Sequence, residues 1–261
     1  MSELFNTFHN HFRVVPAETT DLLETAYRLR YQVYCKENPY EDEEEFPDQM
    51  EFDEYDRHSV QSLVRCRASG HHAGLVRLVL PDPENPDKPL PVEQFCDVND
   101  DKKGIDLSAI PHESLAEISR FCISKESKRV CSERAATATV GNCPDLHVDP
   151  YKRLLPHITL GLFAGIVRMS AEENITHWLA VMEPTLLRFL TRFGIHFHKI
   201  GPLVDYHGKR QPVVGLIDEV LAGIYAQRKD VWEIITDYGN VWPLSDNAEP
   251  VGDNIRLAVA N

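Results

Sequence analysis

The sequence predicts an α/β fold in which helices cover a mixed central sheet. Two neighbouring strand-like segments read as an antiparallel hairpin, later strands alternate with helices, and 43% of the 261 residues are hydrophobic. An antiparallel hairpin followed by strands that alternate with helices is typical of a mixed sheet flanked by helices. The length and composition predict one enlarged domain over residues 1–261 and exclude a disordered, collagenous or coiled-coil chain.

The first element expected is an amphipathic helix over Thr19–Glu37, because apolar residues recur there at helical spacing behind a capping Thr-Thr-Asp start. The acidic segment that follows, residues 37–56, holds 11 carboxylates and no lysine or arginine. A packed element tolerates such a run only if other segments supply cations, so part of it is expected to be a solvated loop.

The remaining elements follow from apolar runs and turn residues. A proline-rich, acidic stretch near residues 81–112 is expected to be a surface insertion with little regular structure. In chain order we expect strands at Ser59–Arg67, Ala73–Leu80 and Leu115–Ile123, a helix from Tyr151 to about Glu173, a strand at Thr176–Met182, a helix from Pro184 to Phe193, strands at Ile195–Ile200 and Gln211–Leu216, and a helix near Ile217–Tyr238 within a C-terminal helical extension near 217–261.

The charge and the apolar runs exclude some classes of protein. A net charge of -14 argues against a nucleic-acid binder, since phosphate contacts need clustered Lys and Arg. Nearly all of the acidic excess lies in residues 1–120, so an acidic partner is expected to dock on the second half. The longest uncharged apolar run, Ile158–Val167, is about half of a membrane span, and no signal peptide is evident, so we expect a cytoplasmic protein with reduced cysteines.

Four short motifs occur in a fixed order and contain most of the chemistry. They are Arg30-Tyr31-Gln32-Val33-Tyr34, Glu51-Phe52-Asp53-Glu54-Tyr55-Asp56, Gly74-Leu75-Val76-Arg77-Leu78 and Glu117-Ile118-Ser119-Arg120-Phe121. Arg77 and Arg120 lie in apolar strands, where an unpaired guanidinium loses its hydration at a cost of several kcal/mol. The acids of the second motif are the dense anion source nearby.

We therefore predict a partly buried network of arginine–carboxylate pairs that joins the first expected helix, the acidic segment and the central strands. Strand alternation places Glu117 and Ser119 on one face of the third strand and Arg120 on the opposite face. The alternative is a solvated acidic loop with strand arginines whose charged ends reach water.

The order of these motifs resembles the acyl-homoserine lactone synthases and their relatives the N-acyl amino acid synthases, including the acyltransferase-like proteins found beside exosortase (PEP-CTERM) systems. The resemblance covers roughly Asp21–Ile123 and implies the fold of the GCN5-related N-acetyltransferases. It implies that the active-site and scaffold residues are Arg30, Tyr34, Glu51, Asp53, Asp56, Arg77, Glu117, Ser119, Arg120, Phe121 and Cys122.

Two positions depart from the pattern of the lactone synthases. Tyr34 stands where that family usually has Phe, and Tyr40 stands where it commonly has Trp beside the S-adenosylmethionine site. These departures, the chain length and the insertion near 81–112 favour the N-acyl amino acid synthase or exosortase-associated branch.

The chemistry expected is transfer of an acyl group from a thioester to an amine. This reaction needs a base for the amine and donors for the oxyanion. Glu117 or Glu51 is the candidate base, a backbone N–H near Phe121–Ile123 is the oxyanion donor that the resemblance implies, and Arg30 or Arg77 is a candidate to hold an amino-acid carboxylate. A covalent route through Cys122 is disfavoured, because buried cysteines are common and no basic partner is evident.

The donor expected is an acyl chain on the phosphopantetheine of acyl carrier protein, with no permanently bound cofactor and no metal. Coenzyme A-dependent N-acetyltransferases normally have a Gly-rich pyrophosphate loop after the third strand, and residues 124–129 contain no glycine. The carrier is acidic, and the best local basic surface for it consists of Lys125, Lys128, Arg129, Arg134, Lys152 and Arg153.

The leading hypothesis is thus an acyltransferase that moves a fatty acyl group from acyl carrier protein to an amino acid or related amine. The enzymatic alternative is acyl-homoserine lactone synthesis from S-adenosylmethionine. A different class also remains open, namely a non-catalytic acyl-binding or regulatory module, or a Ca²⁺-binding one that uses Glu51, Asp53 and Asp56.

Overall fold

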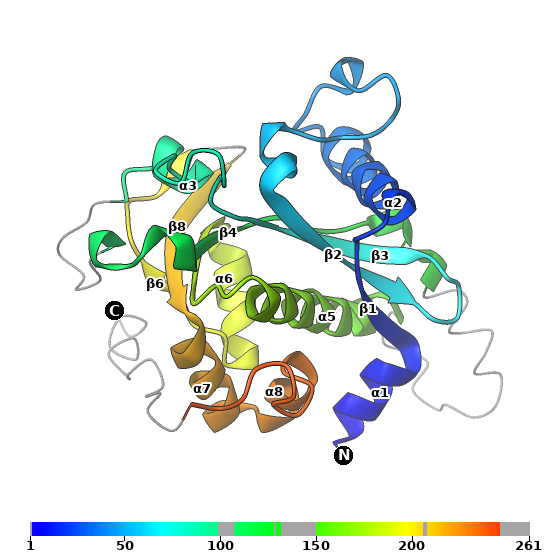
Figure 1. Ribbon diagram of the computed structural model, residues 1–261. Helices are drawn as coiled ribbons and strands as arrows, with labels where there is room; N and C mark the ends of the chain where they lie inside the picture. Colours follow the sequence, from blue (N-terminus) through cyan, green and yellow to red (C-terminus); the bar gives the residue numbers. More distant parts are fainter. Residues whose placement is uncertain (1, 99–106, 128, 132–149, 206–207, 246–261) are drawn as a thin grey trace, which may run out of the picture.

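The computed structural model describes residues 2–98, 107–127, 129–131, 150–205 and 208–245, and its centre is one mixed sheet (Figure 1). The strands are β1 (Phe12–Pro16), β2 (Ser59–Cys66), β3 (His72–Val79), β4 (Leu115–Ile123), β5 (His177–Met182), β6 (His198–Lys199), β7 (Val204–Asp205) and β8 (Lys209–Leu216). Their order is β1-β2-β3-β4-β5-β8-β6, and β7 pairs with β8. Pairing is antiparallel except between β4 and β5.

Helices cover both faces of this sheet (Figure 1). They are α1 (Glu3–His11), α2 (Thr20–Tyr31), α3 (Pro91–Phe95), α5 (Pro150–Glu172), α6 (Pro184–Leu190), α7 (Ile217–Gln227) and α8 (Lys229–Ile235). A π-helical segment, η1 (Gln32–Glu37), continues α2, and 3₁₀ turns lie at η2 (Glu43–Glu45), η3 (Glu54–His58), η5 (Leu107–Ala109), η6 (His112–Ser114) and η7 (Thr191–Phe193). The helix α2 lies on one face, and α5 crosses the other (Figure 1).

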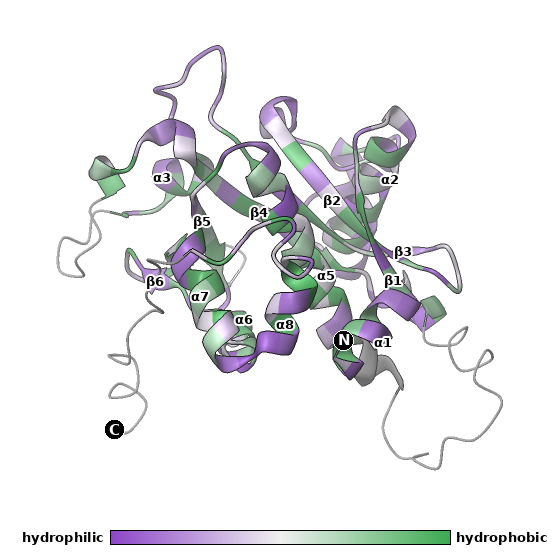
Figure 2. Ribbon diagram, turned by 60° about the horizontal axis from the view of Figure 1, so that its bottom comes forward, coloured by the Kyte–Doolittle hydropathy of each residue, from purple (hydrophilic) through white to green (hydrophobic). Residues whose placement is uncertain are grey.

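The core divides between the two faces. The larger hydrophobic cluster joins α5 to the sheet and includes Phe163 and Trp178, and a second cluster packs Leu29 of α2 on Leu75 of β3. A third cluster joins Val92 of α3 to Leu115, the first residue of β4. Figure 2 shows hydrophobic residues along α5 and the central strands, with hydrophilic residues toward the outside.

Two glycines allow α5 to approach β2 closely. A Cβ atom at Gly165 would lie 2.6 Å from Ser62 Oγ, and one at Gly161 would lie 2.9 Å from a methyl group of Val64. Real Cβ atoms do not come this close, so the helix would have to move away from the sheet. The distance between α5 and β2 therefore depends on these two positions.

The strand β4 contains the irregularity that shapes the site. Leu75 pairs with Cys122, whereas Arg77 pairs with Ser119, so two residues of β4, Arg120 and Phe121, stand opposite one residue of β3. This is a β-bulge, and the backbone of Arg120 has a φ of 47°. On its other side β4 pairs with β5 only from Leu115 to Ile118, so the two strands separate next to the bulge.

The expected helices and strands are confirmed within a few residues, and the differences have local causes. The strands β1 and β7 and the helix α1 are additional. Ser2 caps α1 by accepting a hydrogen bond from Phe5 N–H at 3.2 Å. The insertion contains α3, whose Val92 is buried, so it is more ordered than expected. The last expected helix is two helices, because Arg228 has a non-helical φ of -143°. None of the described helices could span a membrane.

We predict that Gly165→Ala lowers the free energy of unfolding by about 1–3 kcal/mol, because the added methyl group overlaps Ser62. Gly223→Ala in α7 is the matched control: its Cβ meets the Gly194 carbonyl oxygen at an ordinary 3.6 Å, and alanine favours a helix by up to about 1 kcal/mol. Urea unfolding followed by circular dichroism measures both. Equal changes in the two variants would contradict the close approach of α5 to β2.

Candidate active site

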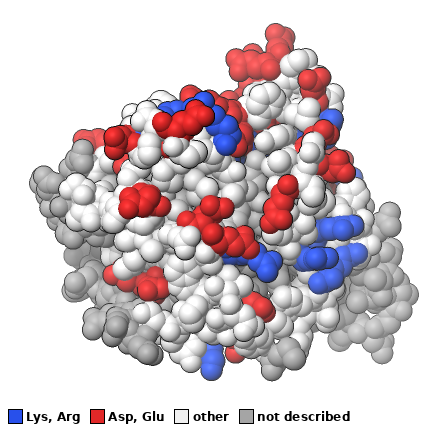
Figure 3. All heavy atoms as spheres, in the orientation of Figure 1, with Lys and Arg blue, Asp and Glu red and all other residues white. Residues whose placement is uncertain are grey.

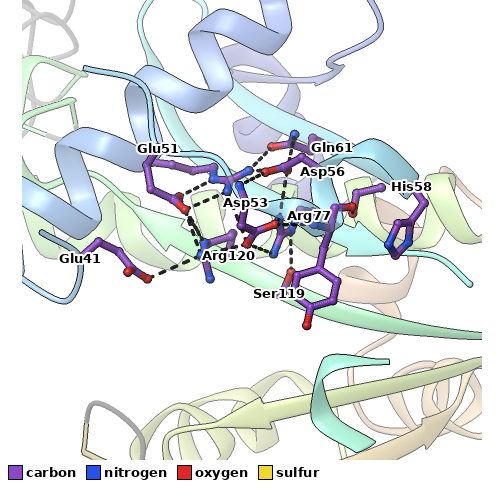
Figure 4. Close-up of polar contacts among 12 residues, drawn as sticks. Glu41, Glu51, Asp53, Asp56, His58, Gln61, Arg77, Ser119 and Arg120 are labelled. Atoms are coloured by element: carbon purple, nitrogen blue, oxygen red, sulfur yellow. Dashed lines mark hydrogen bonds and ion pairs between the residues drawn. The ribbon is translucent and has the colours of Figure 1, made fainter. Parts of the chain in front are cut away.

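Arg30, at the end of α2, is completely buried and takes part in an ion-pair network. Figure 4 labels its partners Glu51 and Asp56 together with Asp53, Arg77 and Arg120 of the same network. Its Nε donates to Glu51 Oε2 at 2.6 Å and its second fork nitrogen to Oε1 at 3.0 Å, so the pair is bidentate. Its remaining nitrogen donates to Asp56 Oδ1 at 2.6 Å. Two carboxylates of the acidic segment are thereby fixed to α2, the helix that the sequence predicted to join this network.

Arg77 of β3 anchors the same segment to the sheet. It donates to the two oxygens of Asp53 at 2.6 and 2.9 Å and, through Nε, to Ser119 Oγ at 2.9 Å. The side chain of Arg77 is only 2% exposed. Asp53 and Asp56 also cap η3 by a reciprocal capping box, which explains why the acidic segment turns sharply here.

Arg120 closes the network, and its position corrects an expectation. It donates to Glu51 Oε1 at 2.9 Å and to Asp53 Oδ2 at 3.1 Å, and it lies 3.6 Å from a carboxylate oxygen of Glu41. Regular alternation places Arg120 on the face opposite Ser119, and that prediction was wrong. The bulge and the positive φ of Arg120 turn its side chain to the same face.

The arginines keep the central carboxylates ionised. Burial by itself raises the pKa of Glu51, but hydrogen bonds and charges from Arg30 and Arg120 outweigh it and hold that pKa below its ordinary value. The same opposition at Asp53, with Arg77 as the main hydrogen-bond donor, lowers its pKa to about 2. These groups therefore stay negative at neutral pH, and their oxygens are engaged by guanidinium groups.

Glu117 lies in a different environment. It is 7% exposed on β4 and accepts a hydrogen bond from the backbone N–H of Val92, at the start of α3, at 2.6 Å. Burial raises the pKa of Glu117 to about 7, against the opposing effects of the Val92 hydrogen bond and the charge of Arg77. A carboxyl group with this pKa exchanges protons near neutral pH.

Known proteins resemble this chain in sequence. Residues 29–137 match the acetyltransferase (GNAT) domain family. An acyl-homoserine-lactone synthase of Aliivibrio fischeri is 25% identical over 190 residues, which cover 73% of this chain and 80% of that protein. Over these residues the chain resembles the acyl-homoserine lactone synthases. The predicted GNAT-like fold is thereby confirmed.

Solved structures of this fold include synthases of both kinds named by the resemblance. The acyl-homoserine lactone synthase LasI has a TM-score of 0.56 at 18% identity, over 83% of this chain and 95% of its own. BjaI, described as a CoA-dependent acyl-homoserine lactone synthase with S-adenosylmethionine and isopentyl-CoA, has a TM-score of 0.54 at 18% identity, over 95% and 98%. FeeM, an N-acyl amino acid synthase from uncultured soil microbes, has a TM-score of 0.50 at 14% identity, over 83% and 96%.

The aromatic and thiol groups next to the network mainly pack against their neighbours. The ring of Tyr34 lies 5.2 Å from the Arg120 guanidinium and 6.3 Å from the ring of Tyr40. Phe121 packs on Phe163 of α5, on the face away from the network. Cys122 is buried beneath α2, and burial raises the pKa of its thiol to about 12. A thiol that stays protonated is a poor nucleophile, which counts against the covalent route.

The segment after β4 is bound by a carboxylate that the sequence did not single out. Glu37, the last residue of η1, accepts hydrogen bonds from Ser124 Oγ at 2.8 Å and from the backbone N–H groups of Lys125 and Glu126 at 2.8 and 3.2 Å. The ammonium group of Lys125 binds the Glu37 carbonyl at 3.3 Å and Asn38 Oδ1 at 3.1 Å. The one signal for Glu37 in the sequence is that it lies shortly after the first motif, which ends at Tyr34.

The other expected docking residues mostly lie outside the described part of the chain. This holds for Lys128 and Arg134 and for the side chains of Lys152 and Arg153. Arg129 is exposed.

Two roles expected for the motif residues do not fit the geometry. The forks of Arg30 and Arg77 are occupied by protein carboxylates, so neither offers a bidentate site for a substrate carboxylate. The same pairing engages Glu51, Asp53 and Asp56 and counts against a Ca²⁺ site there. The sequence also missed Gln61 of β2, whose amide donates to Asp56 at 3.3 Å.

We predict that Asp53→Asn makes the free energy of unfolding depend less on pH in the acid range. The carboxylate is stabilised in the folded state, so its contribution is full above the ordinary pKa of 3.8 and is lost as pH falls toward about 2. This contribution is on the order of 2 kcal/mol. At neutral pH the variant leaves Arg77 underpaired and loses about 3–5 kcal/mol. Urea unfolding between pH 2 and 7 measures both effects.

The exposed Asp48→Asn is the control for Asp53→Asn, because Asp48 lies in the same acidic segment on its solvent side. It should leave both the neutral stability and the pH dependence in the acid range as in the unmodified protein. An Asp53→Asn variant as stable as Asp48→Asn at pH 7 would contradict the network.

Proposed function

We propose that this protein transfers a fatty acyl group from a thioester to the amine of an amino acid or related compound. The observation that supports this best is Glu117, a buried carboxyl with a pKa near 7, on β4 close to the point where β4 and β5 separate. The arginine–carboxylate network holds the acidic segment beside that strand. Proteins similar to this chain include an acyl-homoserine-lactone synthase and an N-acyl amino acid synthase, and these names agree with this reaction class.

Glu117 is the proposed base. A general base works best when its pKa lies near the working pH. It must be deprotonated to take a proton from the substrate ammonium group, so that the neutral amine can attack the thioester carbonyl and the thiol can leave. Glu51, the other candidate, has a lowered pKa and accepts hydrogen bonds from two arginines. It is the poorer base on both counts, and we assign it a scaffold role.

The bulge at Arg120 and Phe121 is the proposed oxyanion site. A bulge leaves a backbone residue outside the regular ladder, so an N–H group becomes available for a ligand. A backbone N–H directed at the thioester carbonyl would stabilise the negative charge that forms there during amine attack. Arg120, whose side chain is 18% exposed, is the network arginine closest to solvent and adds positive charge nearby.

Acyl carrier protein is the proposed donor, and Glu37 supports this choice. Amides at the start of a helix after a strand commonly bind phosphate groups. Here the Glu37 carboxylate already binds the N–H groups of Lys125 and Glu126. A pyrophosphate at that place would meet a negative charge. A carrier-bound phosphopantetheine brings no pyrophosphate to this position, so it avoids that repulsion. The similar structure BjaI is described as CoA-dependent, so donors differ among proteins of this fold.

Acyl-homoserine lactone synthesis is the second candidate, favoured by the lactone synthases among the homologues. Under this alternative the amine belongs to S-adenosylmethionine, and methylthioadenosine leaves when the lactone closes. The same base and the same acyl donor serve both reactions. The candidates therefore differ in the acceptor.

The reaction is tested with purified protein, acyl carrier proteins with several acyl chain lengths and either an amino-acid pool or S-adenosylmethionine. We expect thiol release with an N-acyl amino acid as product, and kcat/KM that rises with pH through about 7, because Glu117 must lose its proton. Glu117→Gln should slow turnover by about 10²–10⁴-fold. Thiol release and product mass measure these outcomes.

The exposed Glu113→Gln is the matched control, since it removes a carboxylate four residues away without touching β4. Methylthioadenosine formation would move the assignment to the lactone reaction. Full activity and an unchanged pH profile in Glu117→Gln would remove Glu117 as the base.

Glu37→Ala is predicted to increase the use of acyl-CoA relative to acyl carrier protein, because it removes the carboxylate from the Lys125 and Glu126 amides. The ratio of kcat/KM for the two donors measures the change, and we expect it to shift by about tenfold, or 1.4 kcal/mol. Glu44→Ala, an exposed acid of the same segment, is the control. A ratio that stays the same in both variants would leave Glu37 a purely structural role.

A further inference from the structure

Three exposed arginines lie together at one end of the sheet, on β1 and at the end of β2. Arg13 and Arg65 are direct cross-strand partners, and both are exposed. Arg67 is exposed as well, and its Nε donates to the carbonyl oxygen of Phe12, the residue before Arg13, at 3.1 Å. We call these three residues the arginine face. Figure 3 shows basic side chains gathered at the right of the molecule, whereas acidic ones are spread over much of the visible surface.

The arginine face is not explained by the folding of the sheet. Like charges directly opposite each other on neighbouring strands destabilise the pair. Within the described ranges, Arg13, Arg65 and Arg67 form no ion pair with a carboxylate, and Arg65 donates instead to the Gly70 carbonyl at 3.1 Å. Burial and the positive charge of Arg65 both lower the pKa of His72. The local potential is therefore positive in a chain of net charge -14.

The arginine face lies at the end of the sheet where β4 finishes. Arg65 is paired with His72 at the start of β3, and the next residue, Ala73, accepts a hydrogen bond from the backbone N–H of Ser124 at 3.1 Å. Along β2, Arg65 is four residues from Gln61, which stands opposite Arg77. At a rise of about 3.3 Å per residue this separation is roughly 13 Å. A flexible prosthetic arm can extend over such a distance.

We propose that the arginine face is the docking surface for acyl carrier protein, an acidic protein that delivers its acyl group on a phosphopantetheine arm; this rests on the proposed function. Complementary charge accelerates encounter and fixes the orientation of a transient partner. It also supplies a reason for keeping two arginines opposite each other. The surface differs from the one expected on Lys125 and its neighbours. The Lys125 ammonium is bound to Glu37 and Asn38, and most of the other residues of that expected surface lie outside the described part of the chain.

Charge reversal tests the surface in the full chain. Arg13→Glu with Arg65→Glu should raise KM for acyl carrier protein at least tenfold with little change in kcat, and should weaken direct binding of holo-acyl carrier protein by a similar factor. Turnover of the same acyl group on free pantetheine should stay within twofold, because that donor does not contact the arginine face. Raising the salt concentration should weaken binding to the unmodified protein much more than to the variant.

Two controls separate docking from folding. Arg188→Glu reverses an exposed arginine on α6, away from the arginine face, and should leave KM unchanged. The single variant Arg13→Glu places an acid opposite Arg65, so it should keep or increase stability while it still weakens carrier binding. A purely structural role for these arginines would change the melting temperature and both donors together.

The possible outcomes distinguish the surface from the reaction. Carrier binding that depends on Arg13 and Arg65 without acylation of any amine would support the surface and contradict the proposed function. Turnover of acyl-CoA or acyl-pantetheine together with no binding of the carrier would overturn the surface and leave acyl transfer standing. An equal loss of carrier binding in Arg188→Glu, or no loss in the double reversal, would also overturn it.

Discussion

Pairing of buried guanidinium groups with carboxylates is the interaction on which the site depends. Arg30, Arg77 and Arg120 bring three positive charges beneath the acidic segment, and Glu51, Asp53 and Asp56 supply three negative ones. Burying any of these charges alone costs several kcal/mol, so the segment packs on the sheet only in the arrangement that pairs them all. The network thereby fixes α2, η3, β3 and β4 relative to one another.

The bulge in β4 makes this pairing possible. Without it, Arg120 would point toward the face that Phe121 uses to pack on α5, and Glu51 would lose one of its two arginines. A positive φ at a residue other than glycine carries a conformational cost, which the ion pairs of Arg120 offset. The same distortion lies beside the place where β4 leaves β5, so the irregularity that completes the scaffold is also the proposed oxyanion site.

Two buried carboxylates on this side of the sheet have opposite properties because their surroundings differ. Glu51 contacts two arginines and stays ionised, whereas Glu117 has one backbone N–H donor and lies farther from the guanidinium groups. A pKa near 7 and a pKa below the ordinary value suit a base and a scaffold respectively. The proposed division of roles therefore follows from burial and distance to arginine.

The sequence by itself determined most of the strands and helices, since apolar periodicity is local, although it did not indicate α1, β1 or α3. It also determined that Arg77 and Arg120 require acids, since an apolar strand cannot hold an unpaired cation. It identified the motif residues and the resemblance that they carry. Only the tertiary structure decided which acid pairs with which arginine, that Arg120 turns to the face of Ser119, and that Glu37 binds the amides after β4. These depend on a backbone bulge and on contacts between residues as many as 89 positions apart, as for Glu37 and Glu126. Neither the bulge nor such contacts leave a periodic pattern in the chain, because each depends on which charged groups the packed sheet brings together.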